Sequence, residues 1–269
     1  MRYLFFIFFC SEWISGNGQA INAASPPYFS IINCYSKNFV DVFSIAGNAA
    51  SCAALEKPAV GIYMERRFML SELNQYCLVS SVPTKLGAFG FQLDYFGYEG
   101  YREIEPSIAF AKKLGVVDLG IKFNYRTVTI PAYGNYASFI PEIGTTWHVT
   151  GKVHTGIRIY YPLPNFEAPE KFAYSFSSGI GYEVSALVFL GLSIIKEESK
   201  NAEVNTVVQY QFARQLFASL GISTRNAHAR FAFGYYYHSL RIDVITGWHP
   251  RLGISPGLMI IYESPGKGK

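Results

Sequence analysis

The chain has 269 residues, of which half are hydrophobic and 17% aromatic but only 16% charged, a low charged fraction for a soluble globular protein. The formal net charge of +4 is small for this length and is not gathered in a basic run, so the sequence lacks the electrostatic signature of a nucleic-acid-binding protein. No stretch approaches the ~20 consecutive apolar residues that a transmembrane helix requires.

The first twenty residues predict an export signal. Arg2 is followed by a compact apolar block, Tyr3 to Cys10, and then by small residues that end at Ala20. A positive start, a short apolar region and a small-residue end are typical of a secretory signal peptide. We therefore expect residues 1–20 to be removed by cleavage after Ala20, with a buried N-terminal helix as the alternative.

Residues 21–57 differ from the rest of the chain. Pro26-Pro27 begins an irregular stretch, and Phe39 to Leu55 is rich in alanine, with apolar residues at roughly helical spacing and a break at Gly47-Asn48. This pattern predicts a short helical segment. Cleavage would leave three cysteines, an odd number that argues against a disulfide framework. Buried free thiols and a Cys34–Cys52 pair both remain open, and no cysteine spacing resembles a metal site.

From residue 58 to residue 263, a unit of about ten residues recurs in which apolar and polar residues alternate. In Val117 to Arg126, the residues Leu119, Ile121 and Phe123 share one face of a strand, and Asp118 and Lys122 share the other. Nearly every segment carries such an apolar face, and no helical layer is predicted to cover it. The sequence therefore predicts an all-β fold: a transmembrane antiparallel β-barrel, apolar outside and polar inside.

We count about fourteen strand segments, an even number that suits a bacterial barrel. Residues 264–269 are expected to form a solvated C-terminal tail. The predicted strands are 58–66, 72–82, 87–97, 101–113, 116–130, 136–149, 152–162, 170–183, 186–198, 201–213, 215–224, 228–238, 240–249 and 254–263. Within such a barrel, residues 21–57 are expected to plug the lumen or to cross its periplasmic mouth, with a surface arm as the alternative.

Charged residues of both signs fall on the inward face of neighbouring strands, so we expect either a paired network or a water-filled channel. The members of the predicted network are Glu103, Glu105, Asp118, Lys122, Arg126, Glu142, Arg158, Arg230, Arg241 and Asp243. A hairpin turn centred on Leu114-Gly115 would set Arg126 opposite Glu103 and let Glu105 reach Lys122 diagonally. Many glycines share the inward parity and would make room for the N-terminal segment or for a ligand: Gly90, Gly120, Gly144, Gly156, Gly179, Gly181, Gly221, Gly234 and Gly247.

The sequence contains no catalytic set that fits a known arrangement, so we expect a protein that is not an enzyme and that needs no cofactor or metal. Ser178-Gly179 lacks the flanking glycine of a nucleophile elbow. His148 and His154 flank one turn and could approach each other. We interpret them as a surface pair rather than as a metal site.

The chain resembles the FadL-type outer-membrane family, and within it the Bacteroidetes branch that includes the PorV and PorQ proteins of the type IX secretion system. Asn48-Ala49-Ala50 stands where that family often has an Asn-Pro-Ala motif. Further likeness lies in Ala59 to Tyr63, in Gly87 to Gln92 and in the closing strand Pro256 to Tyr262. The resemblance implies a plug that includes Asn48, Ala49 and Ala50.

Two functions follow from this resemblance. The first is a FadL-like conduit through the outer membrane of a Gram-negative bacterium for hydrophobic or small solutes. The second is a PorV-like partner barrel, a non-catalytic component of secretion or translocon assembly that binds cargo or a larger protein. The expected partners are outer-membrane lipid, the barrel-assembly machinery, a secretion or translocon component and a hydrophobic ligand, but no nucleic acid.

Overall fold

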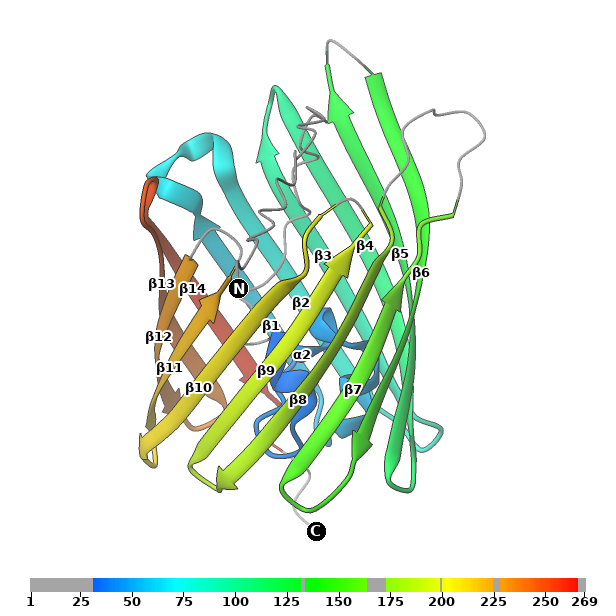
Figure 1. Cartoon of the computed structure of the whole chain (residues 1–269), viewed down its shortest axis with the longest axis vertical. Coiled ribbons are helices and arrows are strands. Elements are labelled where there is room, and N and C mark those ends of the chain that lie inside the picture. The colour runs from blue at the N-terminus through cyan, green and yellow to red at the C-terminus, as the bar shows by residue number, and fades with distance from the viewer. Residues whose placement is uncertain (1–30, 132–133, 164–172, 199, 225–227, 266–269) are drawn as a thin grey trace, which may run out of the picture.

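The computed structural model describes residues 31–131, 134–163, 173–198, 200–224 and 228–265, and in them the chain forms a closed antiparallel barrel (Figure 1). Each strand pairs with its neighbours in the sequence, and β1 pairs with β14 to close the sheet. The strands are β1 (Ala59–Arg66), β2 (Asn74–Pro83), β3 (Ala88–Tyr98), β4 (Tyr101–Leu114), β5 (Val117–Ile130), β6 (Gly134–His148), β7 (Val153–Tyr160), β8 (Ser175–Ser185), β9 (Val188–Glu197), β10 (Glu203–Ala213), β11 (Leu216–Ser223), β12 (His228–Tyr237), β13 (Leu240–His249) and β14 (Gly253–Glu263). The predicted fourteen-stranded all-β barrel is confirmed.

The alternation of side chains on β5 follows the predicted parity. Leu119 and Ile121 are more than 40% exposed on the outer wall, whereas Asp118 and Lys122 are at most 3% exposed and point inward. Because the sheet is closed, each of the described strands has a hydrogen-bonding partner strand on both sides. An apolar outer wall on a closed sheet is the arrangement that a bilayer stabilises.

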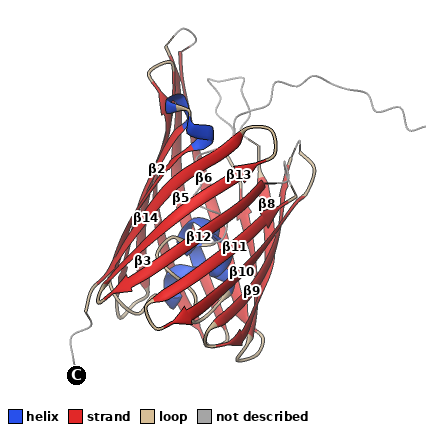
Figure 2. Ribbon diagram, turned by 90° about the vertical axis from the view of Figure 1, so that its left-hand side faces the viewer, coloured by secondary structure: helices blue, strands red, loops and turns tan. Residues whose placement is uncertain are grey.

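The hydrophobic core lies inside the barrel, where residues 31–55 fold into a compact piece that we call the inner segment. It contains three short helices, η1 (Asn33–Tyr35), α2 (Ser44–Gly47) and η2 (Ala49–Ala54). Figures 1 and 2 show it in the half of the barrel nearer the C-terminus. Two further helical turns, η3 (Arg67–Met69) and η4 (Ser71–Leu73), connect β1 to β2 at the opposite end.

None of the helices in the described ranges is long and apolar enough to cross a membrane.

The predicted pairing of β4 with β5 is wrong by two residues. Leu114 pairs with Val117, so the two-residue turn is Gly115-Val116 and not Leu114-Gly115. Gly115 has φ +70°, a conformation that glycine adopts at the first central position of a tight hairpin turn. Lys122 consequently lies opposite Ala109, and Glu103 lies opposite Val128 instead of Arg126.

Candidate functional site: the lumen and the inner segment

The inner segment rests on glycines of the barrel wall. A Cβ added at Gly120 would lie 2.7 Å from the carbonyl oxygen of Ala49, and one at Gly61 would lie 2.5 Å from the ring of Phe43. Such distances are shorter than non-bonded atoms tolerate. The inner segment can therefore approach the wall backbone only because these positions have no side chain. The wall glycines in this seat are Gly61, Gly90, Gly120, Gly144, Gly156, Gly179, Gly181 and Gly191.

Their contacts divide eight of the nine predicted inward glycines into two groups. Gly90, Gly120, Gly144, Gly156, Gly179 and Gly181 contact the inner segment, so most of the predicted room is occupied by this chain itself. Gly234 and Gly247 instead face the wall side chains Phe217 and His228. Gly61 and Gly191 also belong to the seat but were missing from the prediction. The alternation of apolar and polar residues around them predicts the same inward position.

Apolar packing fixes the segment within the seat. The rings of Phe39 and Phe189 stack with centroids 5.4 Å apart, and Phe43 meets Tyr63 edge-on at 6.4 Å. Ile45 is fully buried beside them. η2 packs against β4, β5 and β6, while η1 packs against β7 and β8. Together with the two ring contacts, the segment therefore packs against β1 and against the run of strands from β4 to β9.

The first polar anchor joins the inner segment to β13. Arg241 donates through Nη1 to Asp41 at 3.1 Å and through Nη2 to Asp243 of its own strand at 2.6 Å. The guanidinium also lies over the ring of Phe217, 4.4 Å from the centroid. All three charged groups are buried, and hydrogen bonding among them offsets the cost of removing them from water. The sequence predicted Arg241 and Asp243 as network members but not Asp41.

The second anchor is Glu183 of β8, which holds the turn that follows η1. Its Oε1 accepts hydrogen bonds from Ser36 Oγ at 2.7 Å, from the backbone N–H of Lys37 at 2.6 Å and from that of Asn38 at 3.0 Å. Asn38 Nδ2 donates to the other oxygen, Oε2. One carboxylate thus satisfies the donors of a whole turn.

The third anchor is Asn48, one of the residues that the family resemblance assigned to a plug. Its Nδ2 donates to the carbonyl oxygens of Thr145 on β6 and Ile157 on β7, at 3.0 and 3.2 Å. Its Oδ1 accepts from the N–H of Ala50 at 3.0 Å and so caps η2. Ala49 and Ala50 are fully buried against Gly120. An asparagine here ties the segment directly to the strand backbone.

Ion pairs line the wall formed by β4 to β7. Lys122 Nζ lies 3.2 Å from Glu142 and donates to the carbonyl of Ile45 at 3.4 Å, while Arg158 Nε lies 3.0 Å from the same Glu142 oxygen. Arg126 pairs with Glu103, and its Nε lies 3.9 Å from Glu105. Because of the shifted register, the Arg126–Glu103 contact is diagonal. Glu105 therefore meets Arg126, and the predicted contact of Glu105 with Lys122 is replaced by Lys122–Glu142.

The remaining predicted charges have partners elsewhere in the lumen. Arg230 Nη2 donates to Glu65 at 3.1 Å, and Tyr63 donates to the same carboxylate oxygen at 2.6 Å. Asp118 Oδ2 lies 3.1 Å from His148 Nε2. Glu65, like Asp41, was absent from the predicted network, because its partner lies on a strand more than 160 residues away. The structure thus arranges the ten predicted residues as several separate clusters around the inner segment.

The interpretation of His148 and His154 as a surface pair is wrong. His154 is fully buried, and the Nδ1 atoms of the two rings lie 2.8 Å apart. His154 lies just after the turn between β6 and β7, at a strand position whose side chain points inward. Its ring therefore enters the lumen. Within the described residues, no group of three or more His, Cys, Asp or Glu side chains could hold a metal ion. Cys34, Cys52 and Cys77 are buried free thiols, so the Cys34–Cys52 pair is not formed.

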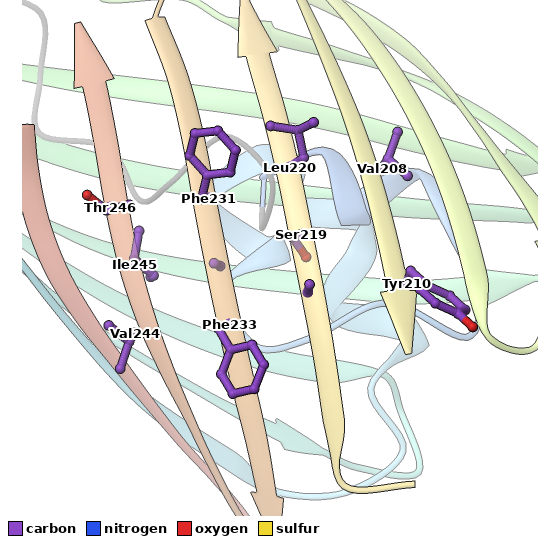
Figure 3. Close-up of a pocket in the computed structure, with 11 residues that line it drawn as sticks. Val208, Tyr210, Ser219, Leu220, Phe231, Phe233, Val244, Ile245 and Thr246 are labelled. Atoms are coloured by element: carbon purple, nitrogen blue, oxygen red, sulfur yellow. The ribbon is translucent and has the colours of Figure 1, made fainter. Parts of the chain in front are cut away.

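A hollow of about 510 Å³ lies on the outer wall over β10 to β13 (Figure 3). It sits over the small outward residue Ala218, between Tyr210 and Phe233, with Leu220 and Phe231 beside it. Since these residues face away from the lumen, the hollow belongs to the lipid-facing surface. Inside the barrel, by contrast, inward residues beyond the inner segment, such as Ser138 and Asn205, are less than 5% exposed.

Comparison with known proteins gives a fold but no close relative. No protein-family model matches the sequence, and no curated protein matches it. Among solved structures, the CymD monoaromatic hydrocarbon channel matches with a TM-score of 0.63 and 11% identity, over 84% of this chain and 93% of that one. The toluene transporter TodX of Pseudomonas putida matches with a TM-score of 0.58 and 8% identity, over 82% and 92% of the two chains.

This chain shares the closed antiparallel β-barrel fold of these channels. A deletion mutant of TodX, described as a monoaromatic hydrocarbon channel, aligns similarly, with a TM-score of 0.63 at 9% identity over 83% of this chain and 94% of that one. At these identities the likeness concerns the fold alone. What distinguishes this barrel is its own lumen, where the inner segment occupies the glycine seat and charged side chains pair with one another.

Proposed function

We propose that this protein is an outer-membrane conduit for small hydrophobic solutes, in which the inner segment acts as a plug. The observation that carries the proposal is the glycine seat: eight wall glycines remove the side chains that would otherwise exclude the segment. If the lumen only had to be filled for stability, large inward side chains of the strands could fill it. A separate piece of chain, held by a few polar anchors, can instead leave the lumen without unfolding the wall.

The location and the solute class belong to the same proposal. The apolar outer wall and the expected signal peptide, residues 1–20, support export to the outer membrane; residues 1–20 lie outside the described ranges. Outer-membrane lipid and the barrel-assembly machinery would then be obligatory partners. The structural similarity to CymD, a monoaromatic hydrocarbon channel, and to TodX, a toluene transporter, supports a hydrophobic solute here.

A second candidate is the partner barrel of the PorV type, which binds a secretion or translocon component and conducts nothing. The observation that favours it is the burial of the inward side chains, which include ion pairs such as Lys122–Glu142 at the level of the inner segment. In such a protein the inner segment would remain in the lumen permanently.

A refolded variant that lacks residues 21–50 distinguishes the conduit from the partner barrel. We expect a folded barrel with higher conductance in planar bilayers, and faster entry of toluene into vesicles that contain it. The full-length protein in the same lipid is the matched control. Unchanged conductance with an intact barrel would contradict the conduit, and recovery of one stable large partner from native membranes would favour the partner barrel.

A further inference from the structure

A second, smaller hollow of about 300 Å³, which we call the rim hollow, lies at the end of the barrel that carries the C-terminus (Figure 1). Its floor is apolar. Ala53 and Leu55 come from the inner segment, and Ala88 and Ala111 come from β3 and β4. Each of the four is at most 9% exposed. The inner segment and the barrel wall therefore build the rim hollow together.

Lysines surround the opening of the rim hollow. Lys85 lies in the turn between β2 and β3, while Lys112 and Lys113 lie near the end of β4. All three are exposed. Lys113 Nζ lies 3.9 Å from Glu56 Oε1, which is the one carboxylate among the described residues that line the hollow. The lining thus carries an excess of positive charge, which favours a negatively charged ligand.

The outer wall beside the rim hollow is apolar. Phe89 of β3 and Phe110 of β4 face outward, and their ring centroids are 5.0 Å apart. Lys112 lies two residues after Phe110 and so shares the outward face of β4. A lysine can keep its apolar stem on such a wall and its ammonium group in water, as at a membrane interface. The same site therefore offers cations for a headgroup and an apolar surface for acyl chains.

The connections at this end of the barrel are those of a periplasmic side. Gly115-Val116 alone joins β4 to β5, whereas the connection from Tyr160 to Ser175 at the opposite end is long. Outer-membrane barrels have short periplasmic turns and longer extracellular loops. The Lys, Arg, Asp and Glu residues in the turns at this end are all cations: Lys85, Lys152 and Arg214. The rim hollow therefore faces the periplasmic leaflet, which consists of phospholipids.

We propose that the rim hollow binds the headgroup of an anionic phospholipid, such as phosphatidylglycerol, whose acyl chains lie along Phe89 and Phe110. The proposal rests on the membrane location given in the proposed function, but not on whether the barrel conducts solutes. Lys85, Lys112 and Lys113 donate to the phosphate oxygens. A headgroup with its own ammonium group, as in phosphatidylcholine, brings a cation against these lysines. Basic pockets at a membrane surface select anionic headgroups in this way.

The test uses the full chain refolded in a non-ionic detergent and freed of lipid. Native mass spectrometry gives the dissociation constants for phosphatidylglycerol and for phosphatidylcholine with the same acyl chains. We expect the first phosphatidylglycerol to bind about tenfold more tightly. Equal dissociation constants for the two lipids would overturn the proposal, and so would inorganic phosphate that binds as tightly as the lipid.

Two double variants remove the same charge from the same end of the barrel. Lys85→Gln with Lys112→Gln should weaken binding of phosphatidylglycerol about 30-fold, since each lysine beside an anionic lipid contributes about fivefold. Lys152→Gln with Arg214→Gln is the matched control and should change binding less than about twofold. All four side chains are exposed, so both variants should refold. Equal losses would reduce the effect to unspecific attraction and reject the site.

Glu56→Gln should have the opposite effect. It removes the negative charge at the opening and the ion pair of Lys113, so phosphatidylglycerol should bind about fivefold more tightly. Unchanged or weaker binding would contradict a headgroup at this position.

A photoreactive group in the acyl chain of phosphatidylglycerol locates the lipid on the wall. It should label the peptides that contain Phe89 and Phe110 in preference to those of another outward aromatic pair, Phe212 and Phe233, whose ring centroids are 5.9 Å apart. Equal labelling of both pairs would reject the site. Cell fractionation tests the membrane location separately. A protein found outside the outer membrane would contradict the proposed function, whereas failure of the lipid tests alone would reject only the rim hollow.

Discussion

Asn48 of the inner segment and Gly144 of β6 are in such close contact that a Cβ added at Gly144 would lie 2.9 Å from Asn48 Cγ, and closer still to its Oδ1. At the same point, Asn48 Nδ2 donates to the carbonyl oxygens of Thr145 and Ile157. The amide group thus reaches the strand backbone only because residue 144 has no side chain. Removal of this space should displace the segment while the wall remains intact.

We therefore expect Gly144→Val to release the inner segment. Valine suits a strand, so the barrel should still assemble, whereas the overlap with Asn48 should cost about 1–3 kcal/mol, the usual penalty of overpacking. Conductance in planar bilayers should rise toward that of the protein lacking residues 21–50. Gly151→Ala is the control, because a Cβ there meets no atom within 4 Å. A closed Gly144→Val barrel would show that Asn48 does not hold the segment.

The outer wall gives a second prediction. Leu119→Arg places a charge on the lipid-facing surface of β5 and should reduce assembly, because arginine on this surface costs ~2–4 kcal/mol at the bilayer midplane and less toward the interface. Leu86→Arg is the matched control: this leucine is 73% exposed but lies in the turn between β2 and β3, outside the strands. The measurement is the fraction of heat-resistant barrel after refolding into vesicles. Equal yields from the two variants would contradict a bilayer around β5.

The strands and their parity could be predicted from the sequence because each depends on a local period of two residues. The pairing of β4 with β5 could not, since it depends on which residues occupy the turn, and the positive φ of Gly115 moves the whole register by two. The space for the inner segment could be predicted from the glycines at inward positions of the strands. Arg241 and Asn48 were among the predicted residues, but the contacts that anchor the segment could not be predicted, because Asp41 and Glu183 have their partners far away in the sequence.

The corrected register changes what is expected of Arg126. Its guanidinium lies between Glu103 and Glu105, so Arg126→Ala leaves one buried and one partly buried carboxylate without this cation. We expect a loss of about 3–5 kcal/mol in the free energy of unfolding, as for other broken buried pairs. Glu103→Gln should cost less, because Arg126 keeps Glu105. Denaturant titration in lipid vesicles measures both, with the exposed Arg214→Ala as a control expected to stay within about 0.5 kcal/mol. Equal losses for Arg126→Ala and Glu103→Gln would show that the arginine does not bridge two carboxylates.

The cysteines of the inner segment report its position. Burial raises the pKa of the Cys52 thiol to about 11, and burial likewise raises that of Cys34. Because the thiolate is the reactive form, Cys52 should be almost unreactive toward a membrane-impermeant maleimide near pH 8, and its reaction should accelerate as the pH rises toward 11. In Gly144→Val the thiol should regain the ordinary pKa of an exposed cysteine, with its reaction reaching a plateau at lower pH. Mass spectrometry of the labelled protein distinguishes Cys52 from Cys34 and Cys77. Rapid labelling of Cys52 in the wild type near pH 8 would place the segment outside the lumen.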